Sequence, residues 1–293
     1  MNQARVDAPR SDLADVPVRW SWLSHFLSSA MHAREAALHG KDPTPAMKLG
    51  TAGHVVTFDQ PFEVFRKENP KTGKVWTRGA KAWDEELERC EASGIELLTV
   101  AEYDKACRIR DALRGNRDAE WLLFGPDVVR EQPIHWVRRG RACSSRPDAR
   151  KPGDWIADLK CVRTARPDRF ASACRFNGYT SQLVFYAEAD AFECGRDPRS
   201  LASEMLPLYN VAIEPFAPFA VTVFELDRTA REHGERILAT CWEALTQAEA
   251  TNYWGGYAEG VVPLVIPAND EAAIDWNDID PPDPEDRDDE EAL

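Results

Sequence analysis

The stretch RPDARKPGDWIADLK, residues 146–160, decides the fold of this chain. Its second half is apolar-rich and bounded by turn residues, which predicts a β-strand. Residues two apart in a strand share a face, so Ile156, Asp158 and Lys160 face one way. Burying a carboxylate and an ammonium is costly unless they pair or bind a metal, so we expect either an ordinary ion pair here or a functional site. The opposite face, which we expect to be core, carries Trp155, Ala157, Leu159 and Cys161.

The sequence around this strand contains further strand-like and helix-like segments. Helices that flank a mixed central sheet make the fold α/β or α+β, in one domain over residues 16–267. Residues 1–15 read as a flexible arm. Apolar, turn-bounded stretches predict strands at 128–140, 141–148, 154–162, 207–214 and 219–226. Helical spacing predicts helices at 20–38, 44–58, 79–94, 99–115, 178–192 and 227–254.

Capping residues give several of these helices defined ends. Thr44 followed by Pro45 is a strong start signal, because proline suits the first helical position. Thr99 and Glu102 form a capping box. The first and last helices are expected to begin at Ser21 and near Asp227, and two others to end at Gly94 and Gly115.

Composition limits the class of protein. Of the 293 residues, 43% are hydrophobic, which is enough for a sizeable core. No apolar run is long enough to cross a bilayer, and residues 1–17 lack the apolar segment of a signal peptide. The seven cysteines are scattered without a CxxC pair, so neither a zinc ribbon nor a disulfide framework is indicated. We therefore expect a reduced, intracellular protein.

Charge is distributed unevenly along the chain. The net charge of −14 at first argues against a nucleic-acid partner, but residues 270–293 alone carry −11. Residues 138–175 hold eleven bases and four acids, a local +7. Because charge interactions are screened beyond about 10 Å, this stretch can bind a polyanion. The tail, residues 268–293, is too acidic and proline-rich to fold alone, and we expect it to be disordered.

A second aspartate sharpens the question that the strand raises. Asp148 lies just before the turn-like stretch ARKPGD, so a hairpin can bring it close to Asp158. Two converging carboxylates repel unless a cation lies between them, and hard oxygen ligands suit Mg²⁺ or Mn²⁺. A neighbouring lysine could act on a water or stabilise charge on a phosphate. This set of groups predicts metal-assisted hydrolysis of a phosphodiester.

Three motifs in this order resemble a known nuclease superfamily. Pro147-Asp148 followed by Asp158-Leu159-Lys160 resembles the PD-(D/E)XK signature. A GxxxH motif at 50–54 and a QxxxY motif at 182–186 match its RecB-like branch. Positions i and i+4 share one face of a helix, so both side chains of the second motif can point toward one site.

Longer stretches resemble the RecE-type exodeoxyribonuclease family of phage and prophage recombination systems. They include TRGAKAWDEE, GIELLTVAEYDKACRIRDAL, EQPIHW and YWGGYAEGVVPLVIP, and the resemblance covers roughly residues 16–267. It implies a PD-(D/E)XK nuclease core. It also implies an Mg²⁺-dependent exonuclease for double-stranded DNA ends, with Mn²⁺ as an alternative ion. Digestion would run 5′ to 3′ and leave a 3′ overhang for a single-strand annealing protein.

The resemblance also implies roles for individual residues. Asp148 and Asp158 would be the main metal ligands, with help from the Leu159 carbonyl. His54 would bind metal from its helix. Glu131 in REQPIHW lies where the family has an acidic residue near the site, and would be a further ligand.

Other residues would act on the substrate. Lys160 would act on the attacking water, while Gln182 and Tyr186 would position the scissile phosphate or the nearby strand. The chain departs from the family at Ser144 and Ser145, where related sequences often have a base. This departure concerns one phosphate contact and not the metal site. Contacts with DNA are expected from Arg78, Lys81 and Arg146, although Arg78 and Lys81 would also fit a solvated basic helix start.

Several alternatives stay open. Relatives form rings that thread DNA, which implies a homo-oligomer in the cytoplasm of a bacterial host without membrane contact. A Cas4-like nuclease would need four clustered cysteines for an iron–sulfur cluster. A non-catalytic DNA-binding or scaffold protein would have no need of the aspartates and the lysine. A protein that is an acidic DNA mimic would not confine its charge to the tail. The tail itself could instead solubilise the protein or dock a partner.

Overall fold

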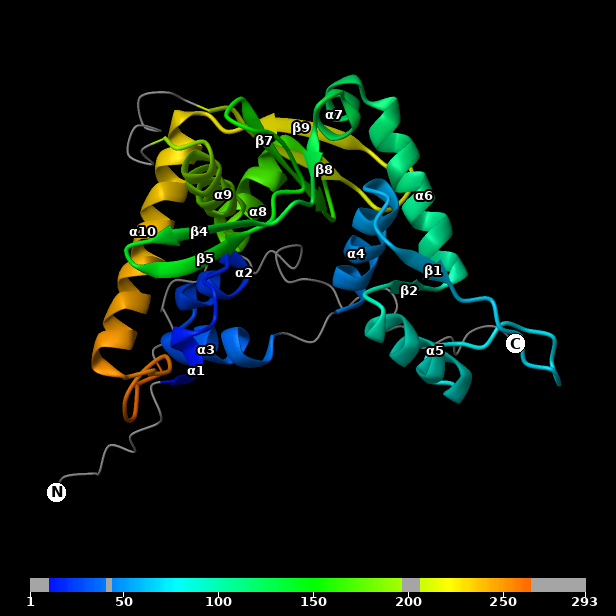
Figure 1. Ribbon diagram of the computed structural model, residues 1–293, viewed down its shortest axis with the longest axis horizontal. Coiled ribbons are helices and arrows are strands. Elements are labelled where there is room, and N and C mark those ends of the chain that lie inside the picture. Colours follow the sequence, from blue (N-terminus) through cyan, green and yellow to red (C-terminus); the bar gives the residue numbers. More distant parts are fainter. Residues whose placement is uncertain (1–10, 41–43, 197–205, 265–293) are drawn as a thin grey trace. The chain divides into compact units, whose positions relative to one another are not determined.

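A five-stranded mixed β-sheet forms the centre of the fold (Figure 1). The structure is a computed structural model, which describes residues 11–40, 44–196 and 206–264. In the sheet, β7 and β8 are parallel and every other neighbouring pair is antiparallel. The strand order is β3 (Val129–Arg130), β6 (Ala149–Lys151), β7 (Trp155–Cys161), β8 (Leu208–Ile213) and β9 (Val221–Glu225).

Helices cover both faces of this sheet, as Figure 1 shows. Ile156 of β7 and Leu208 of β8 pack in one apolar cluster with residues of α9 and α10. On the other face, Leu159 packs with residues of α6 and α7. The predicted class, a mixed α/β fold with a central sheet flanked by helices, is therefore confirmed. The four helices are α6 (Val100–Gly115), α7 (Arg117–Phe124), α9 (Tyr179–Glu193) and α10 (Arg228–Thr251).

Both faces of β7 are buried, whereas the sequence predicted one core face. Ile156 is fully buried and Asp158 is only 1% exposed. The cause is α9, which lies over the face that carries these two residues. The Asp158 carboxylate therefore stands in the interior of the protein and not on a half-exposed surface.

The predicted strand at 128–140 is two strands that belong to different sheets. Its first part is β3, at the edge of the central sheet, and its second part is β4, which pairs only with β5. The backbone turns between them at Glu131, where φ is +51°, and Pro133 has no N–H for a ladder. The small hairpin consists of β4 (Ile134–Arg138) and β5 (Arg141–Ser145).

The predicted helix at 20–38 is wrong as a continuous element. Ser21 does not cap it, because α2 follows an extended Arg19 that makes no capping bond. A new helix instead begins after Ser29, which has extended backbone and accepts a hydrogen bond from the His32 N–H at 3.3 Å. Serines at 28 and 29 thus favour a break over propagation. The segment forms α2 (Trp20–Leu23), the 3₁₀ helix η1 (Ser24–Leu27) and α3 (Ala30–His39).

The arm expected over residues 1–15 is folded from Ser11 on. Residues 11–14 form the short helix α1, and Leu13 is buried. Arg141 of β5 donates a hydrogen bond to the Leu13 carbonyl at 2.8 Å. Residues 1–10 lie outside the described part of the chain.

The other predicted caps are confirmed. Thr44 accepts a hydrogen bond from the Met47 N–H, and the box of Thr99 and Glu102 is complete. Asp227 caps α10. The remaining elements of this region are α4 (Pro45–Thr57), β1 (Phe62–Val64), α5 (Lys81–Ala92) and β2 (Glu96–Leu98), and the predicted stops follow α5 at Gly94 and end α6 at Gly115.

A tight joint connects α8 (Pro167–Asn177) to α9. Gly178 has a φ of +68°, a conformation that glycine adopts at no steric cost. A Cβ at this position would also lie 2.8 Å from Trp20 Cζ2. The joint therefore requires glycine for two separate reasons.

The described residues up to Gly256 form one compact unit. Residues 257–264 belong to a second unit and contain no helix or strand; Val261 is 99% exposed. Within the described ranges, no helix is both long and apolar enough to span a membrane. The expected domain end at residue 267 and the acidic tail lie outside the described residues.

Candidate active site

Asp148 stands where the pairing of β6 with β7 stops. The last paired residues are Ala149 and Ala157, so the register places Asp148 opposite Asp158. Beyond the ladder, the Asp148 carboxylate accepts a hydrogen bond from the Leu159 N–H at 2.6 Å. The hairpin therefore brings the two aspartates together, as the sequence predicts.

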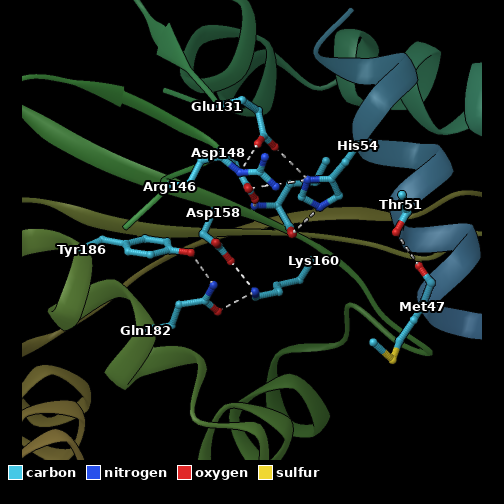
Figure 2. A network of polar contacts seen from close by, with 11 residues as sticks. Met47, Thr51, His54, Glu131, Arg146, Asp148, Asp158, Lys160, Gln182 and Tyr186 are labelled. Atoms are coloured by element: carbon cyan, nitrogen blue, oxygen red, sulfur yellow. Dashed lines mark hydrogen bonds and ion pairs between the residues drawn. The ribbon is translucent and has the colours of Figure 1, made fainter. Parts of the chain in front are cut away.

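His54 reaches this point from α4 (Figure 2). Its Nε2 lies 3.2 Å from the Leu159 carbonyl oxygen. Its Nδ1 lies 3.4 Å from Glu131 Oε1 and 3.5 Å from Asp148 Oδ1. The helix begins after Thr44, whose side chain accepts a hydrogen bond from the Met47 N–H and so fixes the first residue of α4.

Glu131 is held by an unusual backbone. Its φ of +51° is uncommon for a residue that is not glycine. Its N–H donates to the Asp148 carbonyl at 3.1 Å, and its side chain is 7% exposed. Arg146, which is 66% exposed, pairs with the other carboxylate oxygen at 3.0 Å. The turn thus aims a buried carboxylate at His54.

These residues fit a cation. His54, Glu131 and Asp148 each offer a ligand atom, and these atoms lie within 4.8 Å of one another. The Leu159 carbonyl can only accept, so His54 Nε2 carries a hydrogen. The Nδ1 lone pair then faces two carboxylates, unless a second proton or a metal ion lies between them. The described residues thus form a partly buried His/acid cluster that can bind a metal.

The electrostatics of this cluster agree with that reading. Burial works to lower the pKa of His54, but Asp148 and Glu131 outweigh it and raise the pKa to about 9. Burial also raises the pKa of Asp148, and His54 offsets only part of that rise. Without a metal, the cluster therefore holds protons that its members would ordinarily release. A bound cation would take their place.

Lys160 lies on the other side of Asp158. Its Nζ is 2.6 Å from Asp158 Oδ2 and donates a hydrogen bond to Gln182 Oε1 at 2.8 Å. Burial acts to lower the pKa of Lys160, but Asp158 and Asp148 raise it above its usual value. The side chain is therefore an ammonium at neutral pH, which suits charge stabilisation better than removal of a proton.

Gln182 and Tyr186 share one face of α9, as the i, i+4 spacing predicts. Gln182 Nε2 donates to the Tyr186 hydroxyl at 2.7 Å. Burial raises the pKa of Tyr186 well above its usual value, so the phenol stays protonated. The hydrogen bonds from Lys160 to Gln182 and from Gln182 to Tyr186 hold the Lys160 side chain in place (Figure 2).

Asp158 and the Leu159 carbonyl lie beside the cluster that can hold a metal, and their expected roles as metal ligands stay predictions. Asp158 is not part of the three-residue cluster that can hold a metal, and it is paired with Lys160. The Leu159 carbonyl faces His54. The Arg78 Nη2 donates to both carboxylate oxygens of Glu102, at 2.6 and 2.7 Å.

Arg78 also lies over the Trp83 ring, at 4.7 Å from its centroid. Lys81 is 90% exposed and pairs with Glu85 at 3.5 Å. Neither basic residue has a contact with the cluster around His54 among those the structure gives. The expected DNA contacts of these two residues stay predictions.

The sequence did not reveal two further residues of the site. Tyr179 places its ring 4.8 Å from Lys160 Nζ, and its position three residues before Gln182 could have indicated a shared helix face. Asn210 of β8 is 1% exposed and is the register partner of Asp158. A polar residue inside the apolar strand LYNVAI was the available signal.

A second acidic group is already neutralised. Glu63, Glu86 and Cys90 also lie close enough together to hold a metal. Arg89, however, pairs with Glu63 at 2.5 Å and with Glu86, and Lys67 pairs with Glu86 as well. Two cations thus occupy this group, which distinguishes it from the cluster around His54.

Comparison with known proteins supports the fold. No family model and no curated protein matches the chain. Among solved structures, the chain is similar to a crystal structure from Eubacterium rectale named "Putative exonuclease". The TM-score is 0.57 and the identity 12%, with 90% of this chain and 97% of that chain covered. The chain therefore shares the fold of that structure, while the nuclease activity and the RecE-type assignment stay predictions.

Proposed function

We propose that this protein is a metal-dependent exonuclease that digests the ends of double-stranded DNA. One observation carries the proposal. A cluster that can hold a cation, made of His54, Glu131 and Asp148, stands beside an ammonium that is fixed by Asp158 and Gln182. These are the parts that phosphodiester hydrolysis requires.

His54, Glu131 and Asp148 would hold the ion, which we expect to be Mg²⁺ or Mn²⁺ because most of the ligands are hard oxygens. Such an ion would supply Lewis-acid chemistry, which polarises a phosphate and makes a nearby water more acidic. Lys160 donates to the attacking water or to a phosphate oxygen and stabilises the charge that develops there. Gln182 keeps Lys160 in this position, and its own orientation depends on Tyr186.

The finer features of the proposal rest on the sequence resemblance. We infer digestion from 5′ to 3′, with a 3′ overhang that passes to a single-strand annealing protein. We also infer a homo-oligomeric ring around DNA. The basic stretch at residues 138–175 supports a polyanionic substrate, since phosphate contacts supply most of the affinity in such complexes.

An end-labelling experiment tests the reaction. Linear duplexes labelled at the 5′ or the 3′ end are incubated with the protein in Mg²⁺, Mn²⁺ or EDTA. Blunt, nicked and single-stranded substrates are compared. We expect release of the 5′ label from duplex ends only when metal is present. Full activity in EDTA would contradict the metal-assisted mechanism.

The same experiment separates the alternatives. A non-catalytic DNA-binding protein would bind the duplex and release neither label. A Cas4-like enzyme would need four cysteines in one cluster, but among the described residues the only cysteine grouped with other metal ligands is Cys90, beside two glutamates. A DNA mimic would bind DNA-binding proteins and not DNA. Light scattering of the purified protein tests the ring.

A further inference from the structure

An exposed aromatic side chain lies on the helix that leads to the site. Phe176, near the end of α8, is 85% exposed, compared with 45% for Phe192 and for Phe216. A single exposed apolar side chain needs no explanation by itself. Three features of its environment, however, indicate one kind of ligand. They are the packing of α8, the closeness in sequence to a residue that contacts Lys160 and the basic residues nearby.

The support is rigid. Elsewhere on α8, Phe170 is 2% exposed, and its ring lies 4.5 Å from that of Phe224 and 6.0 Å from that of Tyr179. Just after Phe176, the left-handed Gly178 fits tightly against Trp20. The helix therefore presents the Phe176 ring to solvent from a fixed backbone and not from a loop.

Phe176 lies close in sequence to a residue that contacts Lys160. The Tyr179 ring lies 4.8 Å from Lys160 Nζ. Phe176 comes three residues earlier, so the Cα atoms of Phe176 and Tyr179 are at most about 11 Å apart. Nucleotides follow one another every ~3.4 Å along a duplex strand. The Phe176 ring can thus reach a base within a few nucleotides of a phosphate at Lys160.

The surroundings are strongly basic. Between residues 160 and 176, Asp168 is the single acid. An apolar ring among cations matches surfaces that bind single strands, where bases stack on aromatic rings while cations follow the backbone. Arg166 pairs with Asp168, and the net charge of the segment stays positive, which favours a polyanion over an apolar protein partner. The bases of this segment are Lys160, Arg163, Arg166, Arg169 and Arg175, and all but Lys160 are exposed.

We propose that Phe176 is a stacking site for an unpaired nucleobase next to the scissile phosphate. The inference rests on the proposed function for the identity of the polymer as DNA. Inside a duplex both faces of a base are covered by its neighbours, so only a terminal or unpaired base offers a face to the ring. The site accepts any base, because every base has a π-face.

Binding measurements test the proposal without catalysis. The substrate is a duplex with a short single-stranded tail, labelled for fluorescence anisotropy and measured in EDTA. A second version has abasic residues in place of the unpaired nucleotides. We expect Phe176→Ala to weaken binding of the normal tail about tenfold, the scale of one lost base–aromatic stack. Phe176→Trp should keep the affinity, and Phe176→Leu, which is apolar but has no ring, should lose it.

A matched control comes from the next helix. Phe192 follows Gln182 by ten residues in α9, about 15 Å along the helix axis, and it is also a partly exposed phenylalanine. Phe192→Ala should leave binding unchanged. On the abasic tail, the wild type and Phe176→Ala should bind equally, because the stacking partner is missing. Circular dichroism and urea unfolding check that all variants fold.

Several outcomes would overturn the inference. Equal losses for Phe176→Ala on normal and abasic tails would show that the ring does not contact bases. Unchanged DNA binding together with loss of self-association would make the surface a protein interface. If the wild type hydrolyses duplex ends and Phe176→Ala binds both tails normally, the stacking site fails while the proposed function survives. If the wild type cuts nothing but the tenfold difference is present, the proposed function fails alone.

Discussion

The two ends of the β6–β7 hairpin bury charge in opposite ways. At the turn, Arg150 pairs with Asp190 of α9 at 2.8 Å, and both side chains are 2% exposed. The Gly153 N–H donates to the second Asp190 oxygen at 2.9 Å. At the open end, Asp148 and Asp158 stand with Glu131 around a single buried lysine and a half-buried histidine.

The difference separates a structural ion pair from a functional cluster. At the turn, each carboxylate oxygen of Asp190 has its own partner, and Arg150 also pairs with the partly exposed Glu193 at 2.5 Å. At the open end, acids outnumber buried bases, and the His54 ring compensates only when it holds two protons. A surplus of buried acid is stable with a proton or a cation, which makes this end responsive to metal and pH.

The largest expected effect is at the open end. Lys160→Ala should reduce the rate of DNA hydrolysis by a factor on the order of 10³, because the variant lacks a donor aimed at developing charge. DNA affinity should change by no more than a few-fold, since the contribution belongs to the transition state. Lys151→Ala, on the same hairpin and 48% exposed, is the matched control. If binding and hydrolysis fell together, Lys160 would anchor phosphate instead.

The turn end should respond in stability and not in metal binding. Arg150→Met leaves Asp190 buried without its guanidinium and should lower the free energy of unfolding by about 3–5 kcal/mol. The double variant Arg150→Met, Asp190→Leu should recover part of that loss, because both members of the buried pair are then removed. Glu193, which loses Arg150, is 40% exposed, and the Gly153 N–H loses its acceptor. Urea denaturation measures both variants. If Arg150→Met lowered the free energy of unfolding by less than about 1 kcal/mol, well below the cost of breaking a buried pair, the pair would not be structural.

Metal should stabilise the protein through the open end alone. Mg²⁺ at 100 times its dissociation constant should add about 2.7 kcal/mol to the free energy of unfolding. Because the folded pKa of His54 is about 9 and the ordinary value is 6.5, the extra proton stabilises the metal-free protein below 6.5. This stability is lost as pH rises through about 9.

The benefit from Mg²⁺ should therefore grow from pH 6 to pH 9, since the ion must displace that proton. Thermal unfolding with and without Mg²⁺ across this range measures the effect. Asp148→Asn should remove the dependence on Mg²⁺, and Arg150→Met should keep it. A benefit that grew as pH fell would contradict the assignment of the cluster.

The smallest expected effect comes from the exposed Arg146, at the open end of the hairpin. Arg146 is 66% exposed and pairs with Glu131 at 3.0 Å. Exposed pairs contribute about 0–1 kcal/mol, so Arg146→Gln should change the free energy of unfolding by less than that. If Arg146 also contacts a phosphate, the salt dependence of DNA binding should weaken slightly. A loss of stability above 2 kcal/mol, twice that range, would mean that the pair is part of the structural frame.

Sequence reasoning succeeded where the signal was local. The strand at 155–161, the caps at Thr44 and Thr99, and the i, i+4 pair of Gln182 and Tyr186 are each determined by residues a few positions apart. The turn at ARKPGD predicted the hairpin that brings Asp148 close to Asp158. These elements were enough to predict the mixed α/β class and the meeting of Asp148 with its neighbours.

Sequence reasoning failed where distant segments decide. The second face of β7 is buried only because α9 covers it, and no local pattern reports that contact. The left-handed turn at Glu131 depends on packing that overrides strand propensity. The break at Ser29 had a local signal in the two serines, which the helical spacing concealed. The Arg150–Asp190 pair joins residues 40 apart and has no sequence motif.

The contact between His54 and Leu159 spans 105 positions. During synthesis, the ribosome exposes His54 long before the hairpin, and the Gln182–Tyr186 pair emerges later still. No stretch of the growing chain shorter than this contains both the ion-holding groups and the lysine with its support. The newborn polypeptide therefore has no complete site until α9 is made, and an unfinished copy lacks part of the group of residues to which we assign the proposed reaction.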